Sequence, residues 1–197
     1  MATPEGYARN PELVINFYNE RRKQLLDVKP NAGHIGLAEL EKDFNVTVVT
    51  QNVDNLHERA GSKRVIHLHG ELTKVCSSRD PYNPHYIKEL KPDEYEVKLG
   101  DKAGDGTQLR PFIVWFGESV PEIETAVGYV EKADIFVIIG TSMNVYPAAG
   151  LLNYVPRDAE VYLIDPKPVD VHSMRQIHVI QKGASEGVQE LRSLLKP

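Results

Sequence analysis

Short apolar runs alternate along the chain with longer segments in which apolar residues recur at helical spacing. The run at 46–50 carries Val46, Val48 and Val49 in a continuous rather than an alternating pattern, which is typical of a strand buried on both faces. Similar runs predict further strands at 65–69, 112–115, 135–139, 161–164 and 178–180. Helices are expected at 33–43, from residue 54, and at 122–132, 147–154 and 186–195.

The first long helix has clear boundaries. Asn10 is a favoured capping residue, Pro11 suits the first helical position, and Glu12 lies near the positive end of the helix dipole. The helix should end before Lys29-Pro30, because a proline disfavours helical backbone in the preceding residue. Since strands and helices alternate, the sequence predicts an α/β fold in which helices cover both faces of a doubly wound parallel sheet.

Residues 77–108 depart from this pattern. They are rich in Pro, Tyr, Lys, Asp and Gly and lack apolar periodicity, which indicates a mostly irregular insertion. The expected organisation is therefore one domain formed by 1–75 and 110–197, with a small inserted region at 76–109. The inserted region is expected to pack through four residues, Tyr82, Tyr86, Leu90 and Tyr95.

Composition narrows the classes of function. The 197 residues are 41% hydrophobic and 26% charged, which is ordinary for a soluble globular protein. The formal net charge of −5 argues against a nucleic-acid partner. No apolar run is long enough to cross a bilayer, so no membrane partner is predicted and a cytoplasmic location is expected. Cys76 is the single cysteine, which excludes an internal disulfide and a multi-cysteine zinc site.

Four short motifs carry groups suited to chemistry, and all of them lie near apolar strands. Thr50-Gln51-Asn52-Val53-Asp54 places amides and a carboxylate at a strand end, where open α/β sheets bind ligands. His69-Gly70-Glu71 follows the next strand, and Phe116-Gly117-Glu118 and Gly140-Thr141-Ser142 follow later ones. In this order the motifs resemble those of the sirtuin family of NAD-dependent protein-lysine deacylases, and specifically its bacterial desuccinylase/deacetylase type.

The resemblance implies a Rossmann-like fold, NAD as cofactor, and acylated-lysine proteins or peptides as substrates. It implies that the acyl oxygen attacks the NAD ribose and expels nicotinamide, and that His69 then acts as the general base on a ribose hydroxyl. Imidazole suits this role because it titrates near neutral pH. The products would be free lysine, nicotinamide and O-acyl-ADP-ribose. The alternative for His69 is a buried ring satisfied by the backbone.

The resemblance also assigns the cofactor residues. Asp165 departs from the asparagine usual in the family, but a carboxylate can still pair with a ribose diol. An alternative is that Asn52, Asp54 or Ser142 caps a following helix. The residues predicted to bind NAD are Gln51, Asn52, Val53, Asp54, Gly140, Thr141, Ser142, Asp165 and Ala184.

Substrate binding is predicted along one extended segment and one helix. The segment comprises Val114, Trp115, Phe116, Gly117 and Glu118, beside which an acyl-lysine peptide would add as a strand. Tyr18 and Arg21 match, in spacing and position, the pair that holds succinyl or malonyl groups in the resembling subgroup. The alternatives are a core position for Trp115 and a solvated basic helix face formed by Arg21, Arg22 and Lys23.

The sequence departs from the family pattern in two places. No glycine-rich phosphate loop precedes the first helix, so the first strand of the sheet is expected to be missing and the chain to bind NAD poorly. The inserted region carries one cysteine where the family has two pairs, which predicts a module without metal. Two other functions stay open: an inactive module that binds NAD or ADP-ribose, and a metal enzyme that uses His67, His69 and Glu71.

Overall fold

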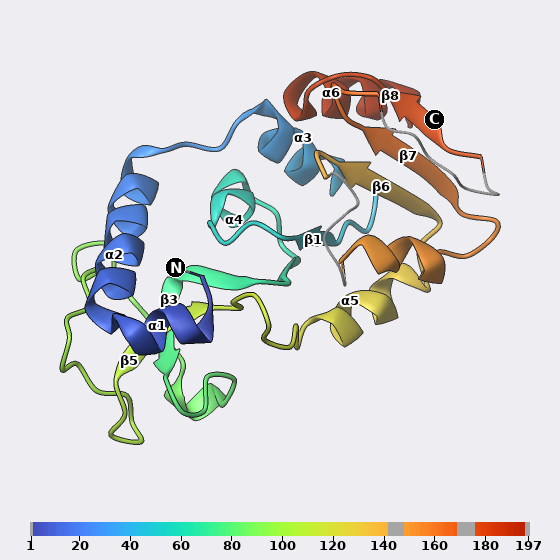
Figure 1. Cartoon of the computed structure of the whole chain (residues 1–197). Helices are drawn as coiled ribbons and strands as arrows, with labels where there is room; N and C mark the ends of the chain where they lie inside the picture. Colours follow the sequence, from blue (N-terminus) through green and yellow to red (C-terminus); the bar gives the residue numbers. More distant parts are fainter. Residues whose placement is uncertain (1, 142–147, 169–175, 196–197) are drawn as a thin grey trace. The chain divides into compact units, whose positions relative to one another are not determined.

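The structure is a computed structural model that describes residues 2–141, 148–168 and 176–195 of the chain. The chain divides into two compact units, which are described separately below (Figure 1). The first unit comprises Met1–Lys29, Thr50–Asn55 and His67–Pro121. The second unit comprises Pro30–Val49, Leu56–Ile66 and Glu122–Pro197.

A parallel sheet forms the centre of the second unit. Its strand order is β6 (Ile135–Ile139), β7 (Glu160–Ile164) and β8 (His178–Ile180), with Ile135 opposite Glu160 and Tyr162 opposite His178. The central strand β7 is buried at four successive positions, which explains its continuous apolar run. The three strands predicted at 135–139, 161–164 and 178–180 are therefore confirmed.

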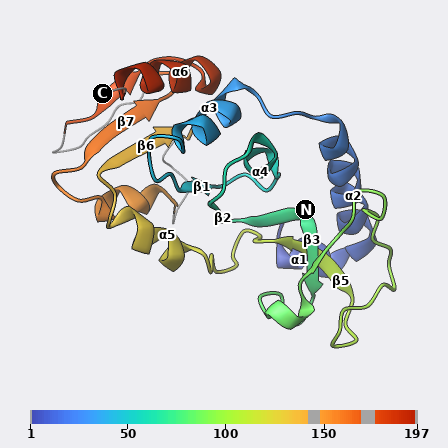
Figure 2. The same cartoon turned by 180° about the vertical axis from the view of Figure 1, so that it is seen from behind.

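Helices cover both faces of this sheet, as the sequence predicts for an α/β fold. In Figures 1 and 2, α6 (Ala184–Leu194) runs along β7 and β8 on one side, and α5 (Ile123–Val130) lies on the other side of the sheet. The helix α3 (Ala32–Leu40) packs against α6, and α4 (Leu56–Ala60) packs against α3. The segment expected as a helix at 147–154 is a 3-10 helix, η2 (Ala148–Tyr154).

One apolar cluster holds α3 and α6 on the sheet. It joins Leu40 of α3 and Val188 and Leu191 of α6 with Ile164 and Ile180 of the strands. At Gly187 the helix α6 approaches β7 so closely that an added Cβ would lie 2.2 Å from a side-chain carbon of Ile164. The absence of a side chain at Gly187 therefore sets the depth to which α6 packs.

The first unit is built on an antiparallel sheet that the sequence did not predict. The central strand is β3 (Gly70–Ser77), flanked by β4 (Lys88–Glu89) and by β5 (Leu109–Ile113). Polar residues interrupt β3, so its sequence contains no continuous apolar run that would predict a strand. The predicted strand at 112–115 is shifted, because β5 ends at Ile113.

Two helices pack on this antiparallel sheet. The helix α2 (Pro11–Asp27) has Asn10 as its cap and contacts β3 and β5, so its predicted start is confirmed. It is preceded by α1 (Pro4–Arg9), which was not predicted. Ile15 of α2, Val75 of β3 and the buried Val97 form the core cluster, with Leu90 packed against it.

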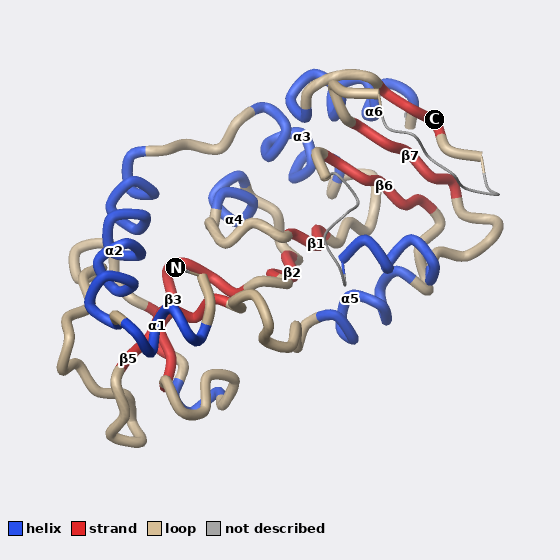
Figure 3. Tube along the Cα trace, viewed as in Figure 1, coloured by secondary structure: helices blue, strands red, loops and turns tan. Residues whose placement is uncertain are grey.

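The segment 76–109 lies wholly within the first unit and is mostly irregular, as predicted. Besides β4 and the ends of β3 and β5, its regular structure is η1 (Pro84–Tyr86), and Figure 3 shows the rest as loop. Asn19 of α2 anchors it, because its side chain exchanges two hydrogen bonds with the backbone of Val97, at 2.8 and 3.0 Å. The predicted domain boundaries at 75/76 and 109/110 remain a prediction.

A cluster of hydrogen bonds closes the inserted region. Asp105 accepts bonds from the hydroxyls of Ser77 and Thr107, at 2.6 and 2.7 Å, and from the amide of Thr107. The hydroxyl of Ser77 in turn accepts the amides of Arg79 and Asp80 at 3.0 Å. The bond from Ser77, followed by those from Thr107, lowers the pKa of Asp105 to about 2.

Two short strands run from the second unit into the first. They are β1 (Val48–Thr50) and β2 (Val65–His67), each shorter than predicted, and they form a two-stranded sheet. The polar motifs follow directly on these strands. Among the described residues, no helix is long and apolar enough to cross a membrane.

Candidate active site

His69 lies in the first unit between two other predicted motifs. Its ring nitrogen Nδ1 is 3.1 Å from the carbonyl oxygen of Gln51. Its own carbonyl oxygen accepts the amide of Val114 at 2.9 Å. A further bond, from the amide of Leu72 to the carbonyl of Val53 at 2.7 Å, extends the contact. The structure therefore brings the histidine motif, the amide-rich motif and the start of the extended segment together.

The partner of Nδ1 determines which nitrogen of His69 is basic. A carbonyl oxygen can only accept a hydrogen bond, so the neutral ring carries its proton on Nδ1. Nε2 then holds the lone pair, and no residue that the structure describes bonds to it. His69 as a residue is partly exposed, and a ring fixed through one nitrogen with the other unbonded has the arrangement that a general base needs.

Gly70 explains why the histidine is followed by glycine. Its φ is 82°, and an added Cβ would lie 2.1 Å from the carbonyl oxygen of Phe112. Gly70 pairs with Ile113 of β5 in the antiparallel sheet. The strand β3 can therefore begin immediately after His69 only when this position has no side chain.

The residues proposed for a metal triad are directed elsewhere. Nδ1 of His67 lies 3.1 Å from the carbonyl of Asn52, whereas His69 faces Gln51. Glu71 forms an ion pair with Lys74. Among the described residues, no three His, Cys, Asp or Glu side chains are placed to hold a metal ion. The geometry gives no support to the metal-enzyme alternative.

A buried ion pair anchors the end of the segment 114–118. Arg110 of β5 is 4% exposed and holds Glu118 with two bonds, at 2.7 and 2.9 Å. Glu118 also accepts the amide of Trp115 at 2.7 Å. Burial raises the pKa of the Glu118 carboxyl, but the bonds from Arg110 and Trp115 outweigh it and hold that pKa below its ordinary value.

Sequence analysis missed Arg110, although one signal was present. An arginine inside the apolar strand Leu109–Ile113 is expected to be buried and hence to need a carboxylate partner. The sequence offers several acidic residues nearby, and only the tertiary structure selects Glu118. Arg110 holds Glu118, and Glu118 in turn holds the backbone amide of Trp115. The Arg110–Glu118 pair thereby sets the path of the segment.

The side chains of the segment 114–118 point to different surroundings. Trp115 is 2% exposed, as the core alternative expects, and its ring contacts the guanidinium of Arg110, whose carbon lies 3.5 Å from the ring centroid. Phe116 is 76% exposed and Gly117 has a φ of 91°. The segment therefore offers Phe116 and its backbone at the surface, while Trp115 is directed inward.

Tyr18 and Arg21 take separate partners. Tyr18 is 5% exposed, and its hydroxyl accepts the indole N–H of Trp115 at 3.0 Å. Arg21 is exposed, donates to Gln24 at 3.1 Å and lies over the ring of Phe17. The structure thus places Tyr18 beside the segment 114–118 and leaves the Arg21 side chain at the surface of α2.

The burial of Arg22 contradicts the alternative in which Arg21, Arg22 and Lys23 all form a solvated basic face. It is 3% exposed, and its Nε donates to the carbonyl of Leu72 at 2.8 Å while Nη1 donates to Asn19 at 2.9 Å. Burial lowers its pKa to about 10. The basic face is therefore limited to the exposed Arg21 and Lys23, because the turn of the helix directs Arg22 into the core.

The other predicted cofactor residues lie in the second unit, at one edge of its sheet. Gly140 follows β6, and its amide donates to the end of β7 at 2.9 Å. Asp165 follows β7, and its amide donates to the end of β8 at 3.3 Å. Ala184 is the first residue of α6. Thr141 follows Gly140, and Ser142 lies outside the described residues.

This edge fits a dinucleotide. The carboxyl ends of parallel strands and the amino end of a helix bind phosphates, because free backbone N–H groups point outward there. Gly140 has a φ of 59°, and an added Cβ would meet no atom of the described residues within 4 Å, so they leave the backbone open to close approach. Gly183, the cap residue of α6, has no side chain that could bond to the first amides of the helix. NAD would be held here by Gly140, Asp165 and the start of α6.

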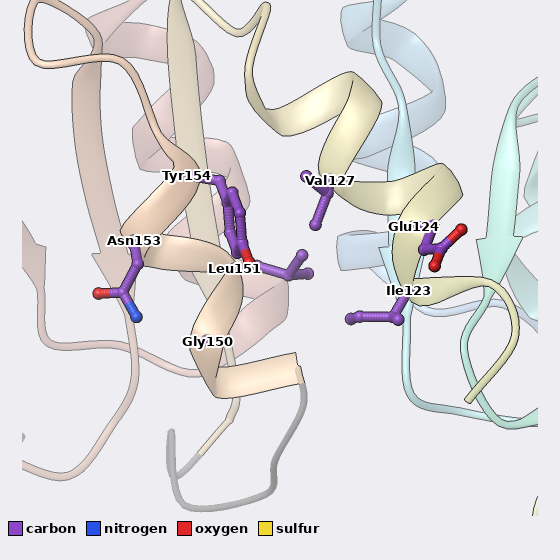
Figure 4. Close-up of a pocket in the computed structure, with 7 residues that line it drawn as sticks. All are labelled: Ile123, Glu124, Val127, Gly150, Leu151, Asn153 and Tyr154. Carbon is purple, nitrogen blue, oxygen red and sulfur yellow. The ribbon is translucent and has the colours of Figure 1, made fainter. Parts of the chain in front are cut away.

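A separate cavity of about 470 Å³ lies in the second unit between α5 and η2. Figure 4 shows the side chains of Ile123, Val127 and Leu151 directed toward one another. None of the predicted site residues that the structure describes lines this cavity. It is lined by Ile123, Glu124, Val127, Gly150, Leu151, Asn153 and Tyr154.

The fold is that of an α/β protein with a parallel sheet, and a histidine is positioned in its first unit. The model of the Sir2 family matches residues 1–147. The "NAD-dependent protein deacylase" of Bacteroides thetaiotaomicron is 84% identical over 197 residues, which are all of this chain and 84% of that protein. The protein of the same name from Helicobacter pylori strain 26695 is 49% identical over 191 residues, or 97% of this chain and 81% of the relative.

Solved structures that resemble this chain belong to the same family. A Sir2 homologue in complex with NAD is 34% identical, with a TM-score of 0.83 over 99% of this chain and 77% of that one. A Sir2 complex with a p53 peptide and NAD⁺ is 29% identical, with a TM-score of 0.78 over 96% of this chain and 80% of the other. The chain belongs to the Sir2 family, which confirms the resemblance to sirtuins.

Proposed function

We propose that the protein is an NAD-dependent protein-lysine deacylase that removes acetyl and short dicarboxylic acyl groups. The observation that carries the proposal is the hydrogen bond between Nδ1 of His69 and the carbonyl of Gln51. It leaves Nε2 as the basic nitrogen, in a residue whose backbone is bonded to Val114 at the start of the proposed substrate segment. The names of the relatives and the NAD complex of the solved homologue support the same activity.

His69 accepts a proton at Nε2 in this proposal. When bound, NAD supplies a ribose carbon that takes up the acyl oxygen and a nicotinamide that leaves. The proton that His69 removes is that of a ribose hydroxyl. The carbonyl of Gln51 then stabilises the imidazolium, because Nδ1 continues to donate to it while the ring is charged.

We propose two groups of cofactor-binding residues, each within one unit. In the first unit, Gln51, Asn52, Val53 and Asp54 offer amide, carboxylate and backbone groups next to the histidine. In the second unit, the open edge provides Gly140, Thr141, Asp165 and Ala184. NAD presents mainly hydroxyl, amide and phosphate groups, which match these partners. Ser142 completes the predicted set but lies outside the described residues.

The substrate is proposed to be an acylated lysine in an extended peptide. The segment from Val114 to Glu118 is suited to this, because the Arg110–Glu118 pair fixes its path and Phe116 is exposed beside Gly117. An added peptide strand gains affinity from backbone bonds and so accepts many sequences around the lysine. The structure of a relative with a p53 peptide supports a peptide substrate.

Tyr18 and Arg21 are proposed to favour acyl groups that end in a carboxylate. Tyr18 offers a hydroxyl directly beside the segment, through its contact with Trp115. Arg21 is exposed on the same helix, and its bond to Gln24 is a surface contact that it can exchange for a carboxylate at low cost. A bond to a charged group contributes about 1.5–3 kcal/mol, which is enough to set an acyl preference.

The experiment that tests the proposal supplies NAD and matched acetyl-lysine and succinyl-lysine peptides and follows all products by mass spectrometry. Because this chain is expected to bind NAD poorly, the assay uses a high NAD concentration. We then expect free lysine, nicotinamide and O-acyl-ADP-ribose in equal amounts, and no product without NAD. His69→Ala should abolish their formation. NAD binding without any turnover would contradict the proposal and favour the alternative, an inactive module that binds NAD or ADP-ribose.

A further inference from the structure

Trp115 and Tyr18 form a hydrogen bond whose direction is unambiguous. The indole of tryptophan has one N–H donor and no acceptor, so the Tyr18 hydroxyl oxygen must accept at the observed 3.0 Å. A hydroxyl carries one proton and two acceptor sites, so the Tyr18 proton is left to be donated elsewhere. In the part of the chain that the structure describes, Trp115 is the only hydrogen-bond partner of that hydroxyl.

The indole is held firmly enough to impose this direction. The guanidinium of Arg110 stacks on its ring, and the ring of Tyr7 lies 5.2 Å from it, centroid to centroid. The backbone amide of Trp115 is bonded to Glu118, which the same Arg110 holds. Both Trp115 and Tyr18 are almost fully buried, so water does not compete for the bond.

We propose that Trp115 is a positioning residue for acyl selectivity, because its indole N–H occupies an acceptor site of Tyr18 and directs the tyrosine proton toward an anionic acyl group. The inference rests on the proposed deacylase function and names how its selectivity is set. An acyl carboxylate can only accept hydrogen bonds at neutral pH, so it binds a hydroxyl that is available as a donor. An acetyl methyl group makes no such demand.

Two further features agree with this role. Burial raises the pKa of Tyr18 above its ordinary value, so the hydroxyl keeps its proton at neutral pH. The bond joins residues 97 positions apart, between helix α2 and the substrate segment. This bond therefore links the helix proposed to set acyl selectivity to the segment proposed to bind the peptide.

The test uses the fact that Trp115 is the only tryptophan in the chain, so its indole N–H gives one NMR resonance. Tyr18→Phe should move this resonance, because the acceptor is lost. In the unsubstituted chain, a succinyl-lysine peptide should shift it more than a matched acetyl-lysine peptide. An indole N–H resonance with the same chemical shift in Tyr18→Phe as in the unsubstituted chain would overturn the proposal.

A double-mutant cycle measures the effect on selectivity. Tyr18→Phe and Trp115→Phe should each lower the ratio of succinyl-peptide to acetyl-peptide affinity, by up to about tenfold. In the Tyr18→Phe background, Trp115→Phe should change that ratio by less than about twofold, because the hydroxyl that it orients is gone. Tyr7→Phe is the matched control, since it removes a hydroxyl from the same aromatic cluster and should leave the ratio unchanged.

The outcomes separate this inference from the function on which it rests. If both peptides bind and the two substitutions act additively on the ratio, Trp115 only fills space and the inference is wrong. If neither peptide binds, the proposed function fails, and the role of Trp115 fails with it. If Trp115→Phe does not fold, the NMR comparison of the unsubstituted chain with Tyr18→Phe still tests whether the indole N–H bonds to Tyr18 and responds to the succinyl-lysine peptide.

Discussion

The ring of His69 donates from Nδ1 to the carbonyl oxygen of Gln51, 18 residues away along the chain and 3.1 Å away in space. This contact orients the imidazole and assigns its tautomer at once. It connects two of the four motifs on which the family resemblance was based, and it is the structural basis of the first prediction.

His69→Ala should lower kcat by about 10²–10⁴-fold, the usual contribution of a general base, while acyl-peptide affinity stays within about twofold. Steady-state rates and peptide titration give the two quantities. His85→Ala is the matched control, because His85 is an exposed residue of η1. Turnover of His69→Ala close to that of the parent would remove His69 from the mechanism.

Arg21→Met should lower kcat/KM for a succinyl-lysine peptide about tenfold or more, because an acyl carboxylate would lose a charged partner. The value for an acetyl-lysine peptide should change little. Lys23→Met removes a neighbouring exposed charge from α2 and controls for general electrostatics. Equal losses on both peptides in Arg21→Met would show that Arg21 supports only the helix.

Arg110→Met should lower the free energy of unfolding by about 3–5 kcal/mol, because it leaves the carboxylate of Glu118 largely buried without its cation. Urea unfolding measures this. The double variant Arg110→Met/Glu118→Gln should recover part of the loss, since no unpaired charge remains. Lys91→Met breaks the exposed Lys91–Glu94 pair and should cost about 0–1 kcal/mol. A similar cost for Arg110→Met would contradict the burial of the pair.

Asp105 should make the stability of the first unit sensitive to acid. Its pKa is about 2 in the folded chain against an ordinary 3.8, so its contribution is complete above the ordinary value and is lost as the pH falls toward about 2. Asp105→Asn should therefore flatten the change in unfolding midpoint between these two values. Asp93→Asn, at an exposed position, is the control. Parallel curves for the unsubstituted chain and Asp105→Asn would refute the prediction.

Glycine-to-alanine substitution should have opposite effects in two helices of the second unit. Gly187→Ala places a Cβ 2.2 Å from Ile164 and should cost about 1–3 kcal/mol through overpacking. Gly128→Ala, in α5, adds a Cβ that meets no atom within 4 Å in the described part of the chain, and it should stabilise the chain by about 0.5–1 kcal/mol through helix propensity. Thermal unfolding of both variants checks the signs. Destabilisation of equal size in both would remove the argument from close packing.

Local sequence determined the elements whose signals lie within a few residues. The cap at Asn10 and the proline at Pro11 started α2, and continuous apolar runs marked β6 and β7. The composition of 76–109 indicated an irregular segment, and the order of the motifs indicated the Sir2 family, which the comparisons confirm. These features depend on backbone preference and burial, which each residue type expresses locally.

The tertiary structure decided which distant groups meet. It placed the polar-interrupted β3 in an antiparallel sheet, buried Arg22 rather than leaving it solvated, and paired Arg110 with Glu118. It also gave Tyr18 the indole of Trp115 as a partner. No local pattern specifies such partners, because a buried hydrogen-bond donor or charge can pair with any complementary group within reach. Only the packing of the whole unit brings one of them to bonding distance.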